Sequence, residues 1–223
     1  MANSGTSSLS IPTLQSGDSG QLIVDFDPGF YTLTPEEKQA IADTSSVRIY
    51  KKGALLLKPG QVANYCYFVF KGCVREYYLI DGEEKTTAFY TEGDSISSNS
   101  SFIQRVPAKH YWECIEECTL SSTSYEGELE LFRRCPRFGT LCREKVEEKL
   151  GEYQEKLAAY MLSTPEERYL DILSNRPDLL YRVPQYQLAS YIGVKPESLS
   201  RIRRRISNSP ITAGKSKSPL QMS

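Results

Sequence analysis

The residues whose types and spacing could support chemistry lie near the C-terminal end, within the run from Pro196 to Arg205. The periodicity of this run predicts a helix, with one glutamate, two serines and an arginine on or beside its outward side. An arginine guanidinium can bind O6 and N7 of guanine together, and a carboxylate can accept from N4 of cytosine. A helix that presents such groups suits the DNA major groove. The candidate base-reading residues are Glu197, Ser198, Ser200 and Arg201.

The neighbouring basic and polar side chains are suited to phosphate oxygens, which carry no sequence information. From Arg182 onward the chain has eight basic residues and one acidic residue, a formal charge of +7, whereas the remainder carries −8 within a total of −1. A basic segment on an acidic body is the electrostatic pattern of a chain that binds a polyanion at one end. The alternative is a solvated basic tail. The candidate phosphate-binding residues are Gln185, Lys195, Arg203, Arg204 and Arg205.

Catalytic and metal chemistry is poorly represented in the sequence. The chain has one histidine, His110, and its six cysteines form no C-x-x-C pair. We found no motif for a nucleophile and its base or for a phosphate-binding loop. We therefore expect a protein that is not an enzyme, with no catalytic residue, no metal site and no cofactor. The cysteines are expected to be free thiols, of which Cys135 and Cys142 are candidates for redox sensitivity.

Two short helices are predicted to position the basic residues. Residues 185–192 suit a first helix, Gly193 permits a tight turn, and a second helix begins near Pro196. Residues 181–184 are expected to lead into this pair in extended form. Three apolar residues of the second helix would face inward, namely Leu199, Ile202 and Ile206.

Upstream lies a predicted helix of about 20 residues with a narrow apolar stripe between charges of both signs. Such a stripe is typical of a two-helix dimer interface, and the alternative is a helix that packs on its own domain. A second helix is predicted after Thr164, where Thr164 and Glu167 form a capping box. The stripe consists of Cys142, Val146, Leu150, Tyr153, Leu157 and Tyr160.

The first half of the chain is rich in short segments of β-branched and aromatic residues, between about 47 and 124. Turn residues separate these segments, and Asp81-Gly82 is the strongest hairpin signal. This spacing is typical of an antiparallel sandwich or barrel. A capped helix is predicted at 34–43, ahead of the strands. No apolar run approaches the roughly 20 residues that cross a bilayer, and residues 1–20 do not resemble a signal peptide, so we expect a cytoplasmic protein without a membrane partner.

Three modules together resemble the Crp/Fnr superfamily of bacterial transcription regulators, most closely the branch common in Bacteroidetes. The segments RVPQ at 182–185, LASYIGV at 188–194 and PESLSRIR at 196–203 are similar to its helix-turn-helix. LLKPG at 56–60 and YFVFKGCVR at 67–75 are similar to the opening strands of its cyclic-nucleotide-binding-like β-roll. The long helix lies between them, in the family's order. The resemblance covers about residues 30 to 206.

The resemblance implies an α+β fold with a jelly-roll-like β-roll, a long dimerisation helix and a C-terminal winged helix-turn-helix. The corresponding segments are a disordered tail at 1–29, the effector domain at 30–134, the dimerisation helix at 135–163 and the DNA-binding domain at 164–223. It also implies a homodimer on a near-palindromic DNA site, with RNA polymerase as a partner. Glu197, Ser200 and Arg201 match the family's Glu-x-x-Ser-Arg pattern for base reading.

Two departures from the family pattern concern the wing and the ligand. Only the Ser-, Pro-, Gly- and Lys-rich residues 207–223 remain for a wing, which suggests a short or disordered one. The Gly-Glu and Arg-Ser pairs of the nucleotide cassette are replaced by Ser97-Ser98 and Ala108-Lys109. We therefore expect an unknown small-molecule effector rather than a cyclic nucleotide. The absence of cysteines before Cys66 disfavours an iron-sulfur cluster. Haem ligation by His110 is also disfavoured. The alternative function is a small-molecule or redox sensor with weak DNA binding. The candidate effector pocket is Tyr90, Ser97, Ser98, Arg105, Lys109 and Tyr111.

Overall fold

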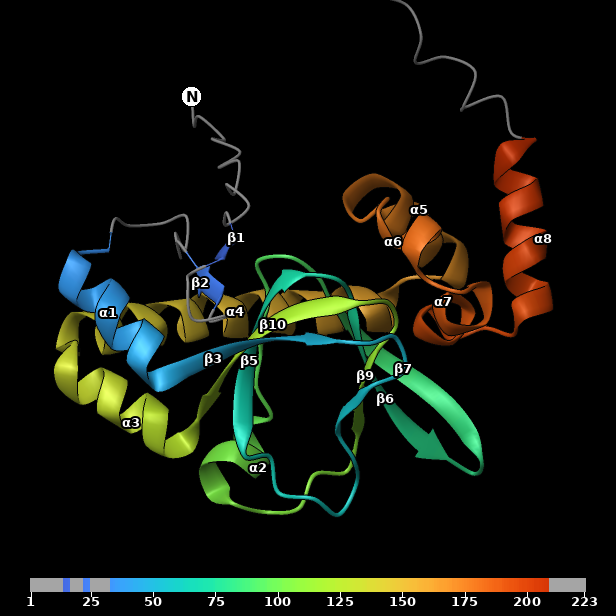
Figure 1. Cartoon of the computed structure of the whole chain (residues 1–223). Coiled ribbons are helices and arrows are strands. Elements are labelled where there is room, and N and C mark those ends of the chain that lie inside the picture. The colour runs from blue at the N-terminus through green and yellow to red at the C-terminus, as the bar shows by residue number, and fades with distance from the viewer. Residues whose placement is uncertain (1–13, 17–21, 25–32, 209–223) are drawn as a thin grey trace, which may run out of the picture. The chain divides into compact units, whose positions relative to one another are not determined.

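The computed structural model describes residues 14–16, 22–24 and 33–208 (Figure 1). The chain divides into two compact units, Met1–Lys156 and Leu157–Ser223. Within the segment expected to be a disordered tail, two short strands, β1 (Leu14–Ser16) and β2 (Leu22–Val24), form an antiparallel pair. The rest of that segment and residues 209–223, most of the 207–223 segment that remained for a wing, lie outside the described residues.

The first unit is built around two four-stranded antiparallel sheets (Figure 1). One has the order β3-β10-β5-β8 and the other the order β4-β9-β6-β7. The predicted α+β class, with an antiparallel β-roll followed by helices, is confirmed. The strand bounds are β3 Ser45–Tyr50, β4 Leu55–Leu57, β5 Tyr65–Lys71, β6 Val74–Ile80, β7 Glu83–Tyr90, β8 Ser95–Ile96, β9 Tyr111–Cys114 and β10 Cys118–Ser124.

The predicted hairpin joins β6 to β7 at Asp81 and Gly82, which have φ angles of 52° and 80°. Two consecutive positive φ values suit the twist of a two-residue hairpin, and Asp and Gly are the residue types that adopt them. Inward-facing side chains of both sheets form one apolar core. Its fully buried members include Val69, Val74, Ile96, Trp112 and Leu120.

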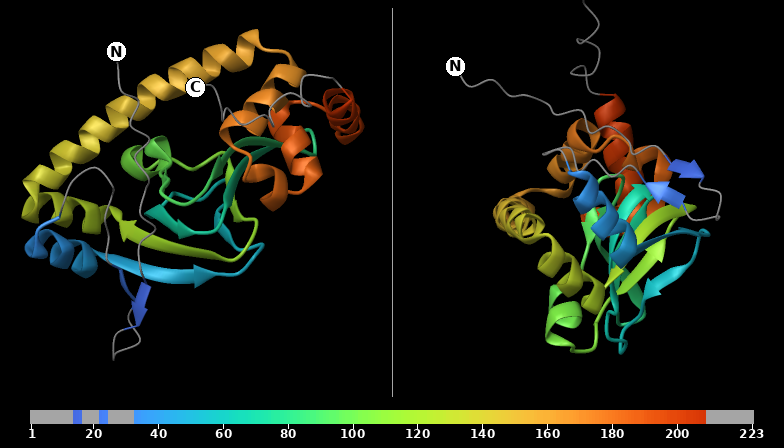
Figure 2. Two further views of the ribbon diagram at one scale, coloured as in Figure 1. Left: turned by 90° about the horizontal axis from the view of Figure 1, so that it is seen from above. Right: turned by 60° about the vertical axis from the view of Figure 1, so that its left-hand side comes forward.

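Four helices accompany the sheets: α1 (Pro35–Thr44), α2 (Asn99–Gln104), α3 (Tyr125–Arg134) and α4 (Pro136–Leu162). The predicted capping box at Thr34 and Glu37 is present at the start of α1. Ala40 of α1 packs with Leu131 and Cys135, so α1 and α3 lie side by side, as Figure 2 shows. α4 is one continuous helix of 27 residues, longer than the predicted 20 (Figure 2).

The second unit contains α5 (Pro165–Asn175), α6 (Leu179–Arg182), α7 (Gln185–Ile192) and α8 (Pro196–Ser207). The predicted capping box of Thr164 and Glu167 is present at the start of α5. The expectation of extended backbone from residue 181 is wrong, because Tyr181 and Arg182 end the one-turn helix α6. Leu179, which is 1% exposed, anchors this turn in the apolar interior.

Candidate nucleic-acid interface

A sharp turn at Gly193 sets α8 against α7. Gly193 has a φ of 84°, and its N–H bonds the carbonyls of Ala189 and Ser190 at the end of α7. A left-handed residue after the last turn is a common way to end a helix, and glycine adopts it without a steric penalty. Leu188 and Ala189 of α7 are buried, as are Leu199 and Ile202 of α8. The two helices therefore form the predicted helix-turn-helix.

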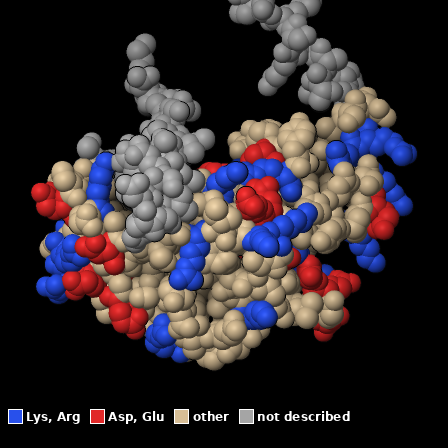
Figure 3. All heavy atoms as spheres, viewed as in Figure 1, with Lys and Arg blue, Asp and Glu red and all other residues tan. Residues whose placement is uncertain are grey.

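The opposite face of α8 carries exposed polar side chains. Glu197, Ser200, Arg201 and Arg204 are exposed and recur at spacings of three and four residues, so they share one face of the helix. Ser200 also donates a 3.1 Å hydrogen bond to the Pro196 carbonyl, one turn back. Figure 3 shows Lys and Arg side chains gathered over α8. This face combines guanidinium, carboxylate and hydroxyl groups, which suits contact with the edges of base pairs.

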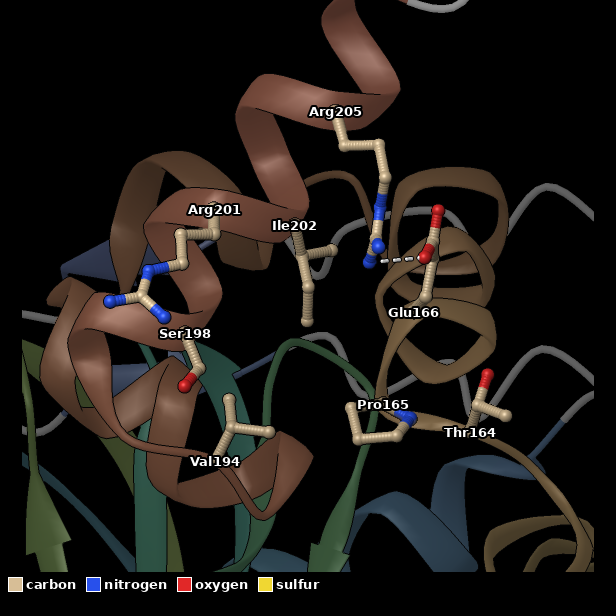
Figure 4. Close-up of a pocket in the computed structure, with 8 residues that line it drawn as sticks. All are labelled: Thr164, Pro165, Glu166, Val194, Ser198, Arg201, Ile202 and Arg205. Atoms are coloured by element: carbon tan, nitrogen blue, oxygen red, sulfur yellow. Dashed lines mark ion pairs between the residues drawn. The ribbon is translucent and has the colours of Figure 1, made fainter.

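Three of the predicted nucleic-acid contacts, Ser198, Arg201 and Arg205, also line a groove between α5 and α8 (Figure 4). Ser198 is half-buried and lines this groove. The Arg205 guanidinium forms a 2.5 Å ion pair with the carboxylate of Glu166, so it is engaged by the chain itself. The open groove has a volume of about 650 Å³ and is lined by Thr164, Pro165, Glu166, Val194, Ser198, Arg201, Ile202 and Arg205.

The other predicted phosphate contacts differ in exposure. Gln185 and Lys195 are exposed, at the start of α7 and directly before α8. Arg203 is half-buried on the flank of α8 and Arg204 is exposed. Together with Arg201 and Arg205 they give the second unit its basic surface, over which a phosphate backbone could be bound.

The apolar stripe of α4 has exposed and partnered members. Val146, Leu150 and Leu157 are 57%, 57% and 62% exposed. Tyr153 interacts through its hydroxyl with Tyr90 of the β-roll, and the Tyr160 ring lies under the Arg168 guanidinium, 3.9 Å from its carbon to the ring centroid. Cys142 is half-buried, and burial with the nearby charge of Glu128 raises the pKa of its thiol to about 11. The exposed leucines and valine form an unpartnered apolar strip in the described chain.

The six residues predicted to form an effector pocket differ in exposure and in the sheet face that they occupy. Ser97, Arg105 and Lys109 are exposed, whereas Ser98 is buried. The Arg105 guanidinium donates to the backbone carbonyl of Ala63 at 3.0 Å and to the Asn64 side chain at 2.9 Å.

Tyr111 stacks on Tyr77 with ring centroids 4.7 Å apart, beside Arg75, on one face of its sheet. Adjacent strand residues point to opposite faces, so Trp112 occupies the core side instead.

A buried polar cluster that the sequence did not reveal lies in the β-roll around Glu76. The Glu76 carboxylate accepts hydrogen bonds from Trp112 Nε1 at 2.9 Å and from the Tyr90 hydroxyl at 3.2 Å, and His110 Nε2 lies 3.8 Å away. Burial and the Glu76 charge raise the pKa of Tyr90, so its hydroxyl is a donor at neutral pH. The available signal was a glutamate inside an otherwise largely buried strand, β6.

The cysteines are free thiols, as expected. Burial raises the pKa of Cys66 to about 12. Cys118 is held by a hydrogen bond with Cys114, which lowers the pKa of the Cys118 thiol and raises that of Cys114. Among the described residues, no group of three or more His, Cys, Asp and Glu side chains could hold a metal ion. None of the helices in the described part of the chain is long and apolar enough to span a membrane.

Comparison with known proteins agrees with this architecture. Residues 47–135 match the cyclic nucleotide-binding domain. The chain is 25% identical over 182 residues to the cyclic AMP receptor protein of Thermus thermophilus, covering 78% of this chain and 83% of that protein. It is similar in structure to CLP, the c-di-GMP responsive global regulator of Xanthomonas campestris (TM-score 0.61, 20% identity, 77% of this chain and 90% of that chain covered).

FixK2 from Bradyrhizobium japonicum is also similar (TM-score 0.60, 18% identity, 79% of this chain and 89% of that chain covered). The branch within the family stays a prediction. Residues 47–135 are therefore similar to the cyclic nucleotide-binding domain, and the chain has the fold seen in regulators of the Crp/Fnr family.

Proposed function

We propose that the protein is a dimeric transcription regulator that reads a near-palindromic DNA site with α8. The observation that carries this proposal is the exposed face of α8, where Glu197, Ser200 and Arg201 stand on a helix fixed by the Gly193 turn. CLP, one of the similar proteins reported above, is named as a global regulator, which supports a function outside catalysis. We assign effector binding to residues 30–134, dimerisation to 135–163 and DNA binding to 164–223, with the cytoplasm as the site of action.

Dimerisation is proposed along α4. Val146, Leu150 and Leu157 present exposed apolar surface, and pairing with a second copy would remove that surface from water. A two-fold axis along paired helices would place two copies of α8 on one duplex, which matches the symmetry of a near-palindromic site. Contact with RNA polymerase is part of the same proposal and rests on the family resemblance.

The effector is proposed to be a small molecule other than a cyclic nucleotide. A cyclic phosphate requires a free cationic fork, and Arg105 is engaged by Ala63 and Asn64. The largely buried Glu76 carboxylate would repel an anion placed near it in the roll. These residues do not fit a cyclic nucleotide. An effector acts by binding one dimer geometry better than another.

The test is selection of bound duplexes from a random-sequence pool by the purified full chain at moderate salt. Wild type should recover a two-fold symmetric site, and Arg201→Ala should lose about 1–3 kcal/mol of discrimination at the base pair it reads. Arg133→Ala is the matched control, because Arg133 is an exposed arginine on α3, ion-paired with Glu130 and outside α8. Recovery of the same site by wild type and Arg201→Ala would overturn the assignment of Arg201.

The second candidate is a sensor in which DNA binding is secondary, favoured by the Tyr90 and Tyr153 hydroxyl contact between the β-roll and α4. Thermal stabilisation by a metabolite, in a chain that recovers no duplex, would support it.

A further inference from the structure

Arg168, in the first turn of α5, joins three segments of the second unit. Its Nη1 donates a 2.6 Å hydrogen bond to the carbonyl of Ile192, the last residue of α7. Its Nη2 donates to the Ser163 carbonyl at 3.0 Å, and its Nε donates to the Ser163 hydroxyl at 3.3 Å. Its guanidinium carbon also lies 3.9 Å from the centroid of the Tyr160 ring. One side chain therefore holds the end of α4, the α4–α5 junction and the turn of the helix-turn-helix.

An added methyl group at Gly193 would displace the tips of two neighbouring side chains. A Cβ on Gly193 would lie 2.7 Å from the Tyr160 hydroxyl and 3.1 Å from Arg168 Nη1. The turn glycine, the tyrosine and the arginine are therefore in close mutual contact. The Ile192 carbonyl is also at the C-terminal, electronegative end of α7, where a cation is favoured.

We infer that Arg168 is a positioning residue that fixes the last turn of α4 against the α7–α8 turn and thereby sets the direction of α8 relative to that last turn. The inference rests on the proposed function, since two copies of α8 can meet two half-sites at one spacing only if each is held firmly relative to its dimer helix. Arg168 would thus determine which half-site spacing the dimer accepts, without touching DNA.

Lysine should not replace Arg168 at this position. The guanidinium donates from three nitrogens in one plane and stacks its face on Tyr160, whereas an ammonium is a compact point charge on a flexible stem. Arg168→Lys keeps the charge and removes the fork, so it separates positioning from electrostatics. Arg168→Gln removes both.

The experiment measures binding of the full chain to the duplex selected by wild type, to the same duplex with its centre lengthened or shortened by one base pair, and to a duplex with one half-site. Arg168→Lys and Arg168→Gln should bind the two-half-site duplex about tenfold more weakly, corresponding to the loss of a few oriented hydrogen bonds, and should lose preference for the natural spacing. Binding to the single half-site should stay within about twofold of wild type.

Salt dependence distinguishes positioning from direct contact. The slope of log K against log salt concentration should be unchanged in both Arg168 variants, whereas Arg204→Gln should lower it by about 0.9 if Arg204 binds a phosphate. Arg133→Gln should match wild type on every duplex. Equal losses on one and two half-sites, a reduced salt slope in Arg168→Lys, or wild-type spacing preference in both variants would each overturn the inference.

A second measurement needs no DNA. Leu162, which is 86% exposed, is a cleavage site for chymotrypsin beside the α4–α5 junction. Both Arg168 variants should be cut there several-fold faster than wild type at unchanged melting temperature, because local opening exposes the junction. Unchanged cleavage would overturn the inference. If wild type selects no duplex but both variants are cut faster, the proposed function fails and the positioning contact stands.

Discussion

The indole N–H of Trp112 donates a 2.9 Å hydrogen bond to the carboxylate of Glu76 in the β-roll. Glu76→Leu leaves this N–H and the Tyr90 hydroxyl without their acceptor, and an unpaired buried donor costs about 1–3 kcal/mol. We expect urea unfolding to show a loss of about 2 kcal/mol, and a smaller loss for Glu76→Gln, which keeps an acceptor. Trp112 is the one tryptophan of the chain, so its fluorescence reports directly on this contact.

The control for the two Glu76 variants is Glu83→Leu, at the exposed start of β7. This variant should keep a free energy of unfolding within about 0.5 kcal/mol of wild type. Equal stability of Glu76→Leu and Glu83→Leu would show that the cluster around Glu76 contributes nothing to the folded state.

The proposed dimer predicts a change of oligomeric state on substitution in the α4 strip. Leu150→Glu buries a carboxylate in each half of a symmetric interface, so the dissociation constant should rise by at least about 100-fold. Analytical ultracentrifugation measures the dissociation constant of the dimer directly. A separate thermal melt gives the melting temperature of the resulting monomer. Arg143→Glu, at an exposed position of α4 outside the strip, should leave the dimer intact. A Leu150→Glu protein with the sedimentation behaviour of wild type would place the interface elsewhere.

Two glycines should respond to alanine with opposite signs. Gly193 has a φ of 84° and close neighbours, so Gly193→Ala should lower the free energy of unfolding by about 1–2 kcal/mol. Gly151 lies within α4, and an added Cβ would meet no atom of the described residues within 4 Å. Gly151→Ala should therefore stabilise by up to about 1 kcal/mol through helix propensity. Chemical denaturation of both variants checks the pair, and the same sign for both would contradict this account.

Glu128 predicts a specific pH dependence of stability. Burial raises the pKa of its carboxyl above the usual value, so the folded state binds this proton more tightly than the unfolded state. The contribution of Glu128 to stability is therefore most favourable below the unfolded pKa and is lost as pH rises through the folded pKa. Glu128→Gln should be more stable than wild type at pH 7, and the difference should shrink toward pH 4.

The control for this effect is Glu126→Gln, which removes a charge from an exposed position in the same first turn of α3. Denaturant titrations between pH 4 and pH 8 compare the two variants. A gain at pH 7 in both, or in neither, would show that burial of Glu128 is not the cause.

Local signals in the sequence were sufficient for several elements of the fold. The capping boxes at Thr34 and Thr164 and the Asp81-Gly82 hairpin each depend on residues within four positions, so their structure follows from local hydrogen bonds and backbone preferences. The bounds predicted for α7 are those of the structure. The short helix α6 was missed because the burial of Leu179, a tertiary contact, outweighed the extended preference expected before Pro184.

The candidate site was predictable in residue type more than in arrangement. Periodicity placed Glu197 and Arg201 on one exposed face of α8, but only three-dimensional packing brings Glu166 to Arg205. The pocket prediction grouped Tyr111 with Tyr90. Adjacent residues of β9 point to opposite faces of the sheet, so Trp112 points into the core and Tyr111 points to the other face. Arg168 gave no sequence signal because its partner at Ile192 lies 24 residues away.

The order in which the chain is made has a consequence for the β-roll. β3, at the edge of its sheet, pairs with β10. The pairing of Ser45 with Thr123 can therefore form only after β10 has been synthesised. During synthesis, the roll can close only once β10 has left the ribosome. Contacts so distant in sequence form slowly, so we expect closure of the roll to limit the rate of folding. A ribosome paused before β10 would hold a chain with its inner strands exposed, open to chaperones and to aggregation.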